Sequence, residues 1–399
     1  MSSSPPLTVL PAILLRLPPD DPAGVVRAAA VCKSWLRVLA DPAFAGRYRA
    51  LHPSAPVLGF LHNQSHLHVA RFVLTSPSRP SPAAAADHHR RHAHDCRHGR
   101  ALFFDYGSLA SFIVWDPTTG AVHKIPEVPD VLTQPAVVCA AAAAGCDHGG
   151  CGGGGHFIVA FAGVQNIPED YYFDAHACFW ASDTREWSVH INIHLDHGRY
   201  RLADRPAALV GDALYFVGTS GFLLRYRYGL LRRVGRNILA AGVREAEVLS
   251  VIEPPQGNKR LGTVFAMAAE DGGLGLASMS KNSSRLYLWA METETAGVAG
   301  DDGRWVQSRI VDLNTLLPAG GNPGSRPCLS GVGEDGSVIF VSTDDGVFTV
   351  ELESSNVKKV CGEMGNKVDL VLPFMSFYTH SLLLKLASGK SAAATVGNQ

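Results

Sequence analysis

An excess of positive charge is absent from this sequence of 399 residues, which holds 35 Lys and Arg against 36 Asp and Glu. Its formal net charge at pH 7 is therefore −1. A protein that binds nucleic acid in general needs a basic field to offset the phosphate charge. We therefore expect no nucleic-acid partner.

Long apolar runs and closely spaced cysteines are absent as well. No segment offers about 18 consecutive apolar residues, so we expect neither a transmembrane helix nor a membrane partner. No basic residue precedes the first apolar stretch, so we expect no secretory signal. The eight cysteines are scattered along the chain, which excludes a small disulfide scaffold. These features favour a reduced compartment, cytoplasmic or nuclear.

What the sequence does contain is two unlike parts. Residues 1–52 hold only two glycines, Gly24 and Gly46. After residue 55, short apolar runs alternate with Gly, Asp, Asn and Pro. This change predicts a helical domain at 1–52 and a β domain at 56–385, with the boundary near residues 53–56.

The first part contains the start signals of several short helices. Asp21 and Asp41 each precede a proline, and aspartate is a good N-cap acceptor where proline is tolerated in the first turn. The segment after Asp21 places apolar residues near helical spacing: Val25, Val26, Ala29, Cys32, Leu36 and Leu39. Helices this short are marginal alone, so they need one another, the next domain or a partner.

The β part predicts a β-propeller. Helical periodicity is nearly absent after residue 55, and about 24 strand-length runs follow one another with turn residues between them. At four strands per blade they make about six blades, which stack because one blade cannot bury both of its faces. The fold class is therefore mainly β, a small α-helical unit followed by a propeller. Residues 115–120, Trp-Asp-Pro-Thr-Thr-Gly, resemble a WD40 strand and turn, so a WD40 array is the alternative.

Three segments do not fit blades. Residues 76–100 are rich in Pro, Ala, His and Arg, and residues 140–155 are low in complexity and rich in glycine. We expect both to be flexible insertions between strands, and we expect residues 386–399 to be a disordered polar tail.

Residues 12–44 resemble the F-box motif. The match consists of an Ile-Leu pair, Leu-Pro, a helix that ends in Val-Cys-Lys-x-Trp, a Leu, and Asp-Pro-x-Phe. The residues that carry it are Ile13, Leu14, Leu17, Pro18, Val31, Cys32, Lys33, Trp35, Leu39, Asp41, Pro42 and Phe44. The sequence departs from the family at Pro5 and Pro6, which stand where Leu-Pro is usual. It also departs at Pro11, which predicts a first helix that starts only there and weakens adaptor binding.

The resemblance is to plant F-box proteins with a C-terminal F-box-associated, kelch-like propeller. It implies a substrate receptor of an SCF-type ubiquitin ligase, in which the F-box binds a Skp1-like adaptor and through it cullin. The propeller would recruit a protein substrate that the sequence does not identify. The residues implied at the adaptor surface are Ile13, Leu14, Leu17, Pro18, Val25 and Val26. Those implied in the F-box core are Val31, Cys32, Trp35, Leu39 and Phe44. The competing interpretation is that all of them are ordinary core of a helical bundle.

Candidates for chemistry are few. His88, His89, His92, His94, Cys96 and His98 are possible metal ligands. Their spacing matches no closed four-ligand site, so a solvated basic loop is the expectation. Cys146, His148 and Cys151 lie in a run of glycines, which offers no side chains to orient metal ligands. We therefore expect no metal, no cofactor and no catalytic residue in a chain that is not an enzyme. The alternatives are a propeller scaffold independent of ubiquitin and, third, a propeller enzyme with an acid pair or metal in its central channel.

Overall fold

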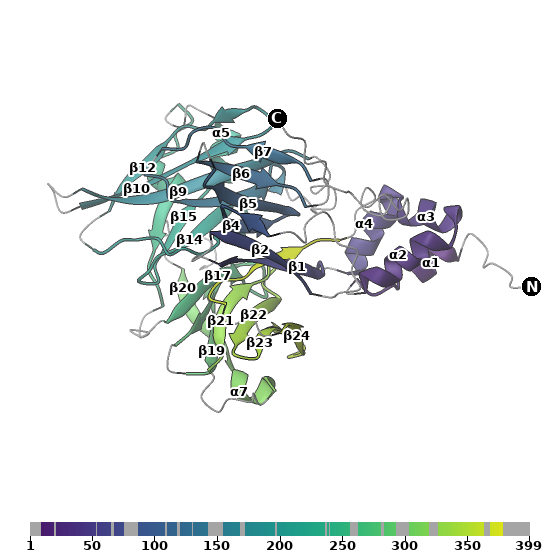
Figure 1. Cartoon of the computed structure of the whole chain (residues 1–399). Helices are drawn as coiled ribbons and strands as arrows, with labels where there is room; N and C mark the ends of the chain where they lie inside the picture. Colours follow the sequence, from purple (N-terminus) through teal and green to yellow (C-terminus); the bar gives the residue numbers. More distant parts are fainter. Residues whose placement is uncertain are drawn as a thin grey trace, which may run out of the picture.

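The computed structural model has an N-terminal helical unit beside a β-propeller of six sheets (Figure 1). The structure describes residues 9–19, 21–52, 54–64, 68–75, 87–107, 110–117, 120–129, 131–142, 155–167, 172–195, 198–235, 238, 240–255, 262–280, 283–292, 303–318, 326–362 and 368–377. A mainly-β fold with about six blades is confirmed.

Four short helices form the N-terminal unit: α1 (Leu10–Leu14), α2 (Pro22–Val31), α3 (Lys33–Leu39) and α4 (Pro42–Leu51). Both expected N-caps are present, since Asp21 accepts a hydrogen bond from the Gly24 N–H at 3.0 Å and Asp41 from the Ala43 N–H at 2.9 Å. Helix α1 has only five residues and contains Pro11 in its first turn. Cys32 is extended, with φ −163° and ψ 166°, and separates α2 from α3.

Each blade is an antiparallel sheet, and the strands of the first three blades are as follows. Blade 1 contains β25 (Leu372–Met375), β1 (Val57–Gln64), β2 (Val69–Leu74) and β3 (His88–His89). Blade 2 contains β4 (Arg91–Arg97), β5 (Arg100–Asp105), β6 (Ser111–Trp115) and β7 (Val122–Lys124). Blade 3 contains β8 (Gln134–Cys139), β9 (Phe157–Ile167), β10 (Tyr172–Ala181) and β11 (Glu186–Trp187), with β12 (Ile191–Leu195) also paired to β10.

The other three blades follow in chain order. Blade 4 contains β13 (Ala208–Val210), β14 (Ala213–Val217), β15 (Leu223–Tyr226) and β16 (Leu249–Ile252). Blade 5 contains β17 (Thr263–Ala268), β18 (Leu274–Met279), β19 (Arg285–Glu292) and β20 (Arg304–Asp312). Blade 6 contains β21 (Cys328–Val332), β22 (Val338–Thr343), β23 (Gly346–Glu351) and β24 (Val357–Cys361).

The ring of blades is closed by the last strand of the described residues. Strand β25 pairs antiparallel with β1, the first strand, and Leu61 lies opposite Leu372. One edge strand of each blade faces the middle of the ring, because β25 contacts β4, β4 contacts β8, and β13, β17, β21 and β25 contact in series. Blade 1 therefore holds the two ends of the propeller together, and β4 lies at the central channel.

The expectation of a flexible insertion at 76–100 is wrong for residues 87–100, which contain β3 and β4. Strand β4 is buried on both faces, with Asp95 at 1% and Cys96 at 4% exposure. Its polar side chains find partners on other blades instead of in water, which composition alone does not reveal. Residues 76–86, most of the 140–155 segment (143–154) and the 386–399 tail lie outside the described residues.

Three short helices interrupt the expected all-strand pattern: α5 (Tyr228–Val234), α6 (Glu245–Val248) and α7 (Leu313–Leu316). Helix α5 follows β15 directly and packs Tyr228 and Leu231 into the core shared by blades 3 and 4. A helix of seven residues gives too few turns for a clear period in the sequence. Among the described residues, no helix has the length and apolar character needed to cross a membrane.

Candidate functional site

The helical unit has its own core, formed by Leu10, Leu14, Val25, Ala28, Ala29, Leu39 and Phe44. Leu14 is 1% exposed and Val25 is 8% exposed. The implied placement of these two residues at the adaptor surface is therefore corrected, because both are buried between the helices. Trp35 and Leu17 are half-buried against the same core.

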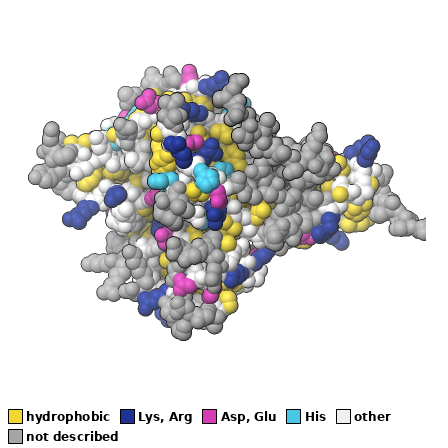
Figure 2. Space-filling model, viewed as in Figure 1, with side chains coloured by type: hydrophobic (Ala, Val, Ile, Leu, Met, Phe, Trp, Pro, Cys, Tyr) yellow, Lys and Arg dark blue, Asp and Glu magenta, His cyan; other side chains and the backbone are white. Residues whose placement is uncertain are grey.

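Other aliphatic side chains of the unit face solvent. Ile13 is 45% exposed, Val31 is 60% exposed, and Pro18 is exposed as well. Val31 and Cys32 were implied to be core, and this is corrected: the extended backbone at Cys32 ends α2 there and leaves both side chains exposed. The side chain of Val26 lies outside the described residues. Figure 2 shows hydrophobic side chains on the surface of the helical unit as well as on the propeller.

Contacts of α4 attach the helical unit to blade 1. The Tyr48 hydroxyl donates a hydrogen bond to the Leu17 carbonyl at 2.7 Å. The Tyr48 ring meets the Phe377 ring edge to face, with centroids 6.2 Å apart, just after β25. Leu14, Pro56 and Phe377 line a small cavity of about 40 Å³ between the two parts. The segment directly after the strand that closes the propeller therefore carries a contact to the helices.

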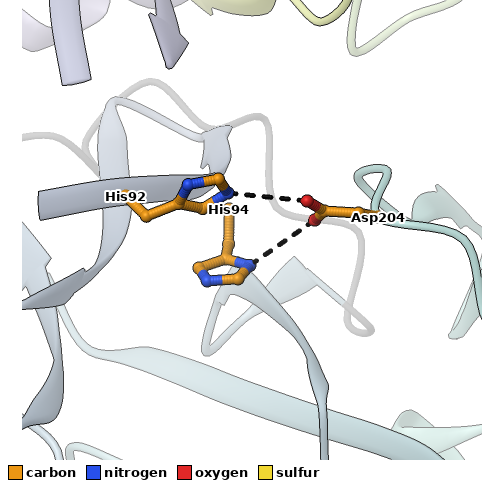
Figure 3. Close-up of side chains that lie close together, drawn as sticks. All are labelled: His92, His94 and Asp204. Carbon is orange, nitrogen blue, oxygen red and sulfur yellow. Dashed lines mark ion pairs between the residues drawn. The ribbon is translucent and has the colours of Figure 1, made fainter. Parts of the chain in front are cut away.

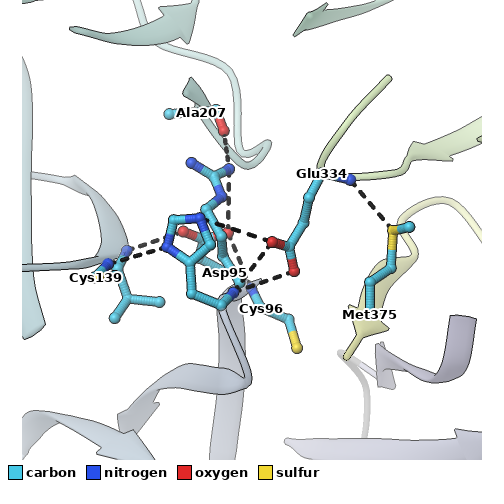
Figure 4. Close-up of polar contacts among 9 residues, drawn as sticks. Asp95, Cys96, Cys139, Ala207, Glu334 and Met375 are labelled. Atoms are coloured by element: carbon cyan, nitrogen blue, oxygen red, sulfur yellow. Dashed lines mark hydrogen bonds and ion pairs between the residues drawn. The ribbon is translucent and has the colours of Figure 1, made fainter. Parts of the chain in front are cut away.

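A buried polar network occupies one end of the central channel (Figure 4). Asp95 on β4 accepts hydrogen bonds from the N–H groups of Cys96 and Val137, both at 2.9 Å. Arg97 lies 3.6 Å from Asp95 and donates to the carbonyl of Ala207, next to β13. Blades 2, 3 and 4 are tied together by these contacts.

Glu334 extends the network to blades 6 and 1. Its carboxylate accepts hydrogen bonds from the His98 N–H at 3.2 Å, and its own N–H donates to the Met375 Sδ at 3.4 Å. The turn that holds Glu334 depends on Gly336, which has φ +74° and where a Cβ would collide with the Ala268 carbonyl. His98 in turn accepts a hydrogen bond from the Cys139 N–H through Nδ1 at 3.0 Å.

Burial decides the protonation of this network. It raises the pKa of Glu334 to about 8, although Arg97 acts in the opposite direction. It also raises the pKa of Asp95, again against Arg97. A carboxyl with its pKa raised to about 8 holds a proton at neutral pH. Because backbone N–H groups on neighbouring strands are its main partners, the network joins blades.

A second polar group lies near the other end of β4. His92 and His94 on β4 and Asp204, in the segment before β13, point toward one another (Figure 3). Their nitrogen and oxygen ligand atoms all lie within 4.8 Å of one another. Figure 2 shows histidine side chains near the centre of the face in view, with acidic and basic groups beside them.

Sequence reasoning included two of these three residues and missed the third. Alternate residues of a strand share a face, so the spacing of His92 and His94 was a usable signal once β4 is recognised as a strand. Asp204 is 110 residues beyond His94, and nothing in its neighbourhood marks it as a ligand. Only the closed ring of blades brings it to β4.

Comparison with known proteins gives similarity of structure alone. No family model matches the chain, and no curated protein matches its sequence. TolB from Acinetobacter baumannii is 12% identical, with a TM-score of 0.40 over 82% of this chain and 70% of that one. The Cps50 (Swd1) β-propeller domain from Myceliophteria thermophila is 10% identical, with a TM-score of 0.35 over 72% of this chain and 88% of that one.

An oligogalacturonate lyase in complex with manganese is 8% identical, with a TM-score of 0.35 over 74% of this chain and 70% of that one. None of these similarities assigns a function. The six sheets themselves define the class: a six-bladed β-propeller preceded by a small helical unit, a fold that suits a protein-interaction scaffold.

Proposed function

We propose that the chain is the substrate receptor of an SCF-type ubiquitin ligase. In this proposal the helical unit is an F-box that binds a Skp1-like adaptor, and through it cullin. The propeller recruits the protein substrate. The observation that carries the proposal is that the residues resembling the F-box motif form a separate helical unit beside blade 1, with aliphatic side chains of that motif in solvent.

Ile13 and Val31 are the residues that we assign to the adaptor contact. They are 45% and 60% exposed, and an amphipathic helix face of this kind suits the groove of a partner. Covering the exposed part of two aliphatic side chains contributes roughly 1–2 kcal/mol, so they form the centre of a larger contact that includes Pro18 and Leu17.

The chain performs no chemistry in this proposal. Its contribution is proximity, because holding a substrate lysine near a charged ubiquitin carrier raises their effective concentration. This role suits a propeller whose buried carboxyls, Asp95 and Glu334, are bonded to backbone N–H groups.

A scaffold independent of ubiquitin is the second candidate. It is favoured by the burial of Leu14 and Val25, which leaves fewer motif residues free for an adaptor than the family resemblance implies. In that case the helical unit only packs on blade 1, and the propeller binds partners by itself.

Co-purification with a plant Skp1-like adaptor separates the two candidates. The intact chain is compared with an Ile13→Lys, Val31→Lys double variant. The matched control is Ile310→Lys, Val122→Lys, at propeller positions that are 49% and 51% exposed. Lysine is chosen because Ile13 and Val31 lie in the last turns of their helices, where a positive charge is tolerated.

The receptor proposal expects the intact chain and the control to retain the adaptor and the double variant to lose it, with melting temperatures unchanged. Equal binding by all three contradicts the assigned surface. A folded intact chain that binds no adaptor contradicts the receptor proposal and leaves the scaffold.

A further inference from the structure

Three acceptor atoms converge at the His92, His94 and Asp204 group. The His92 Nε2 lies 3.6 Å from Asp204 Oδ2, and the His94 Nδ1 lies 4.0 Å from Asp204 Oδ1. Both distances exceed the range of a hydrogen bond, so no shared proton joins the rings to the carboxylate. The His94 Nδ1 is buried and, in the described part of the chain, has no hydrogen-bond partner.

The protonation of His92 follows from Asn63 on β1. Both ends of the Asn63 amide are held by Ala93, whose N–H donates to Oδ1 and whose carbonyl accepts from Nδ2, each at 2.8 Å. The second N–H of Nδ2 then faces the His92 Nε2 at 3.1 Å. This nitrogen therefore carries a lone pair and no proton.

His94 supplies a second ring nitrogen to the same place. Its Nδ1 is buried and, among the described residues, accepts and donates no hydrogen bond. The Asp204 carboxylate lies on the other side of the two rings. Two ring nitrogens and a carboxylate thus face one another.

The neighbouring cation does not fill this place. The Arg205 guanidinium lies over the Phe265 ring, 4.6 Å from its centroid, and within the described residues forms no ion pair with Asp204. Acceptor atoms that face one another at such short range repel, and a bound cation removes that repulsion.

We propose that His92, His94 and Asp204 bind one divalent transition-metal ion of the zinc type, as a site that bridges blade 2 to the segment leading into blade 4. Imidazole nitrogens with a carboxylate are ligands for zinc and its neighbours, whereas magnesium and calcium take oxygen ligands. Zinc bonds of 2.0–2.2 Å in a tetrahedral site put ligand atoms roughly 3.3–3.5 Å apart, so ligand atoms that now lie within 4.8 Å of one another need to close by at most about 1.5 Å.

The ligands differ in freedom, which allows this closure. The His94 side chain is 15% exposed and is held against the Phe112 ring, with centroids 5.6 Å apart. The Asp204 side chain is 62% exposed and lies outside the strands. The carboxylate therefore moves toward the two rings, and the fourth position of the ion faces water. The lone pair of His92 passes from the Asn63 N–H to the ion.

Titration calorimetry of the metal-free full chain with ZnCl2, in a phosphine reductant that keeps the cysteines reduced, tests the site. The tested variants are His94→Ala and Asp204→Asn. The matched control is His194→Ala, which breaks the histidine–aspartate pair with Asp174 at 2.7 Å, a pair without a third ligand in the described part of the chain. MgCl2 is the control ion.

We expect one zinc ion per chain and a loss of zinc affinity of at least about 100-fold in both variants. Removing a residue that only hydrogen-bonds to a metal ligand already lowers metal affinity by about 10–100-fold, so removing a ligand costs at least that much. The control variant and MgCl2 leave zinc binding unchanged. With Co²⁺ as the probe, the intact chain is expected to show the visible bands of nitrogen and oxygen ligation and no thiolate charge-transfer band. Those visible bands are expected to disappear in Asp204→Asn.

Three results overturn the proposal. The first is zinc binding that both variants retain, since it places the ion on other ligands. The second is a strong Co²⁺–thiolate band, since it places the ion on cysteines. The third is the absence of zinc binding by the folded chain. Because Asp204 is exposed, Asp204→Asn remains informative even if His94→Ala fails to fold. The adaptor experiment does not depend on this outcome.

Discussion

Replacing Glu334 with glutamine removes the buried titrating group at the end of the central channel. The glutamine carbonyl retains an acceptor for the His98 N–H, which now lies 3.2 Å from both carboxylate oxygens. The side chain of Glu334 is 20% exposed, so little solvent reaches it. The substitution therefore preserves shape and hydrogen bonding and removes mainly the ability to titrate.

The expected effect on stability depends on pH. Burial raises the pKa of Glu334 to about 8, whereas an unfolded glutamate titrates near 4.3. Between these values the folded chain holds a proton that the unfolded chain releases, so the free energy of unfolding falls as the pH rises. Below about pH 4 both states are protonated and Glu334 costs nothing; above about pH 8 the whole cost is present.

The size of the cost follows from the shift. One unit of pKa corresponds to about 1.4 kcal/mol, so the full cost is at most on the order of 5 kcal/mol. Glu334→Gln is therefore expected to gain little relative to the intact chain at pH 5 and progressively more toward pH 8. His62, His88 and His94, whose pKa values burial lowers to about 4, titrate in the opposite sense, so only the difference between the two proteins isolates Glu334.

Urea unfolding of both proteins at pH 5, 6, 7 and 8 measures this difference. Glu353→Gln, at an exposed position after blade 6 strand β23, controls for the loss of one negative charge. A difference between Glu334→Gln and the intact chain that stays constant from pH 5 to pH 8 would refute the argument that burial keeps Glu334 protonated.

Two further predictions concern packing and hydrogen bonds. The Tyr228 hydroxyl is buried without a hydrogen-bond partner among the described residues, so Tyr228→Phe is expected to leave stability unchanged or to raise it by about 1 kcal/mol. Tyr48→Phe, which loses the 2.7 Å hydrogen bond to Leu17, is expected to lower the free energy of unfolding by about 1 kcal/mol. Urea unfolding of both variants measures the contrast, and an equal loss of stability in Tyr228→Phe and Tyr48→Phe would contradict it. Phe374→Ala in the closing strand β25, where the ring is 1% exposed and packs on Phe72, is expected to cost about 3–5 kcal/mol in urea unfolding. Ile310→Ala, at 49% exposure, is its control, and a cost as small as that control's would show that β25 does not hold the ring of blades closed.

Local signals in the sequence predicted much of the secondary structure. Asp21 and Asp41 mark helix starts because the cap is made by their own side chains within the first turn. Runs such as those of β6 and β22 are mostly apolar because they are buried on both faces. The count of about six blades follows from such runs, since each blade needs four of them.

Other features depend on partners far away in the chain. Strand β4 is polar in composition, and its polar side chains are buried because they contact other blades. Its sequence alone therefore resembles that of a loop. The break at Cys32 carries neither proline nor glycine, and it reverses the expected burial of Val31.

The sequence by itself determined the N-terminal helical unit, the mainly-β class and the approximate number of blades. These features arise from helix caps, turns and apolar runs that each span only a few residues. Only the tertiary structure decided that β25 closes on β1, that Glu334 is buried beside His98, and that Asp204 faces His92 and His94. These contacts join residues more than 100 positions apart, and their position depends on the completed ring of blades.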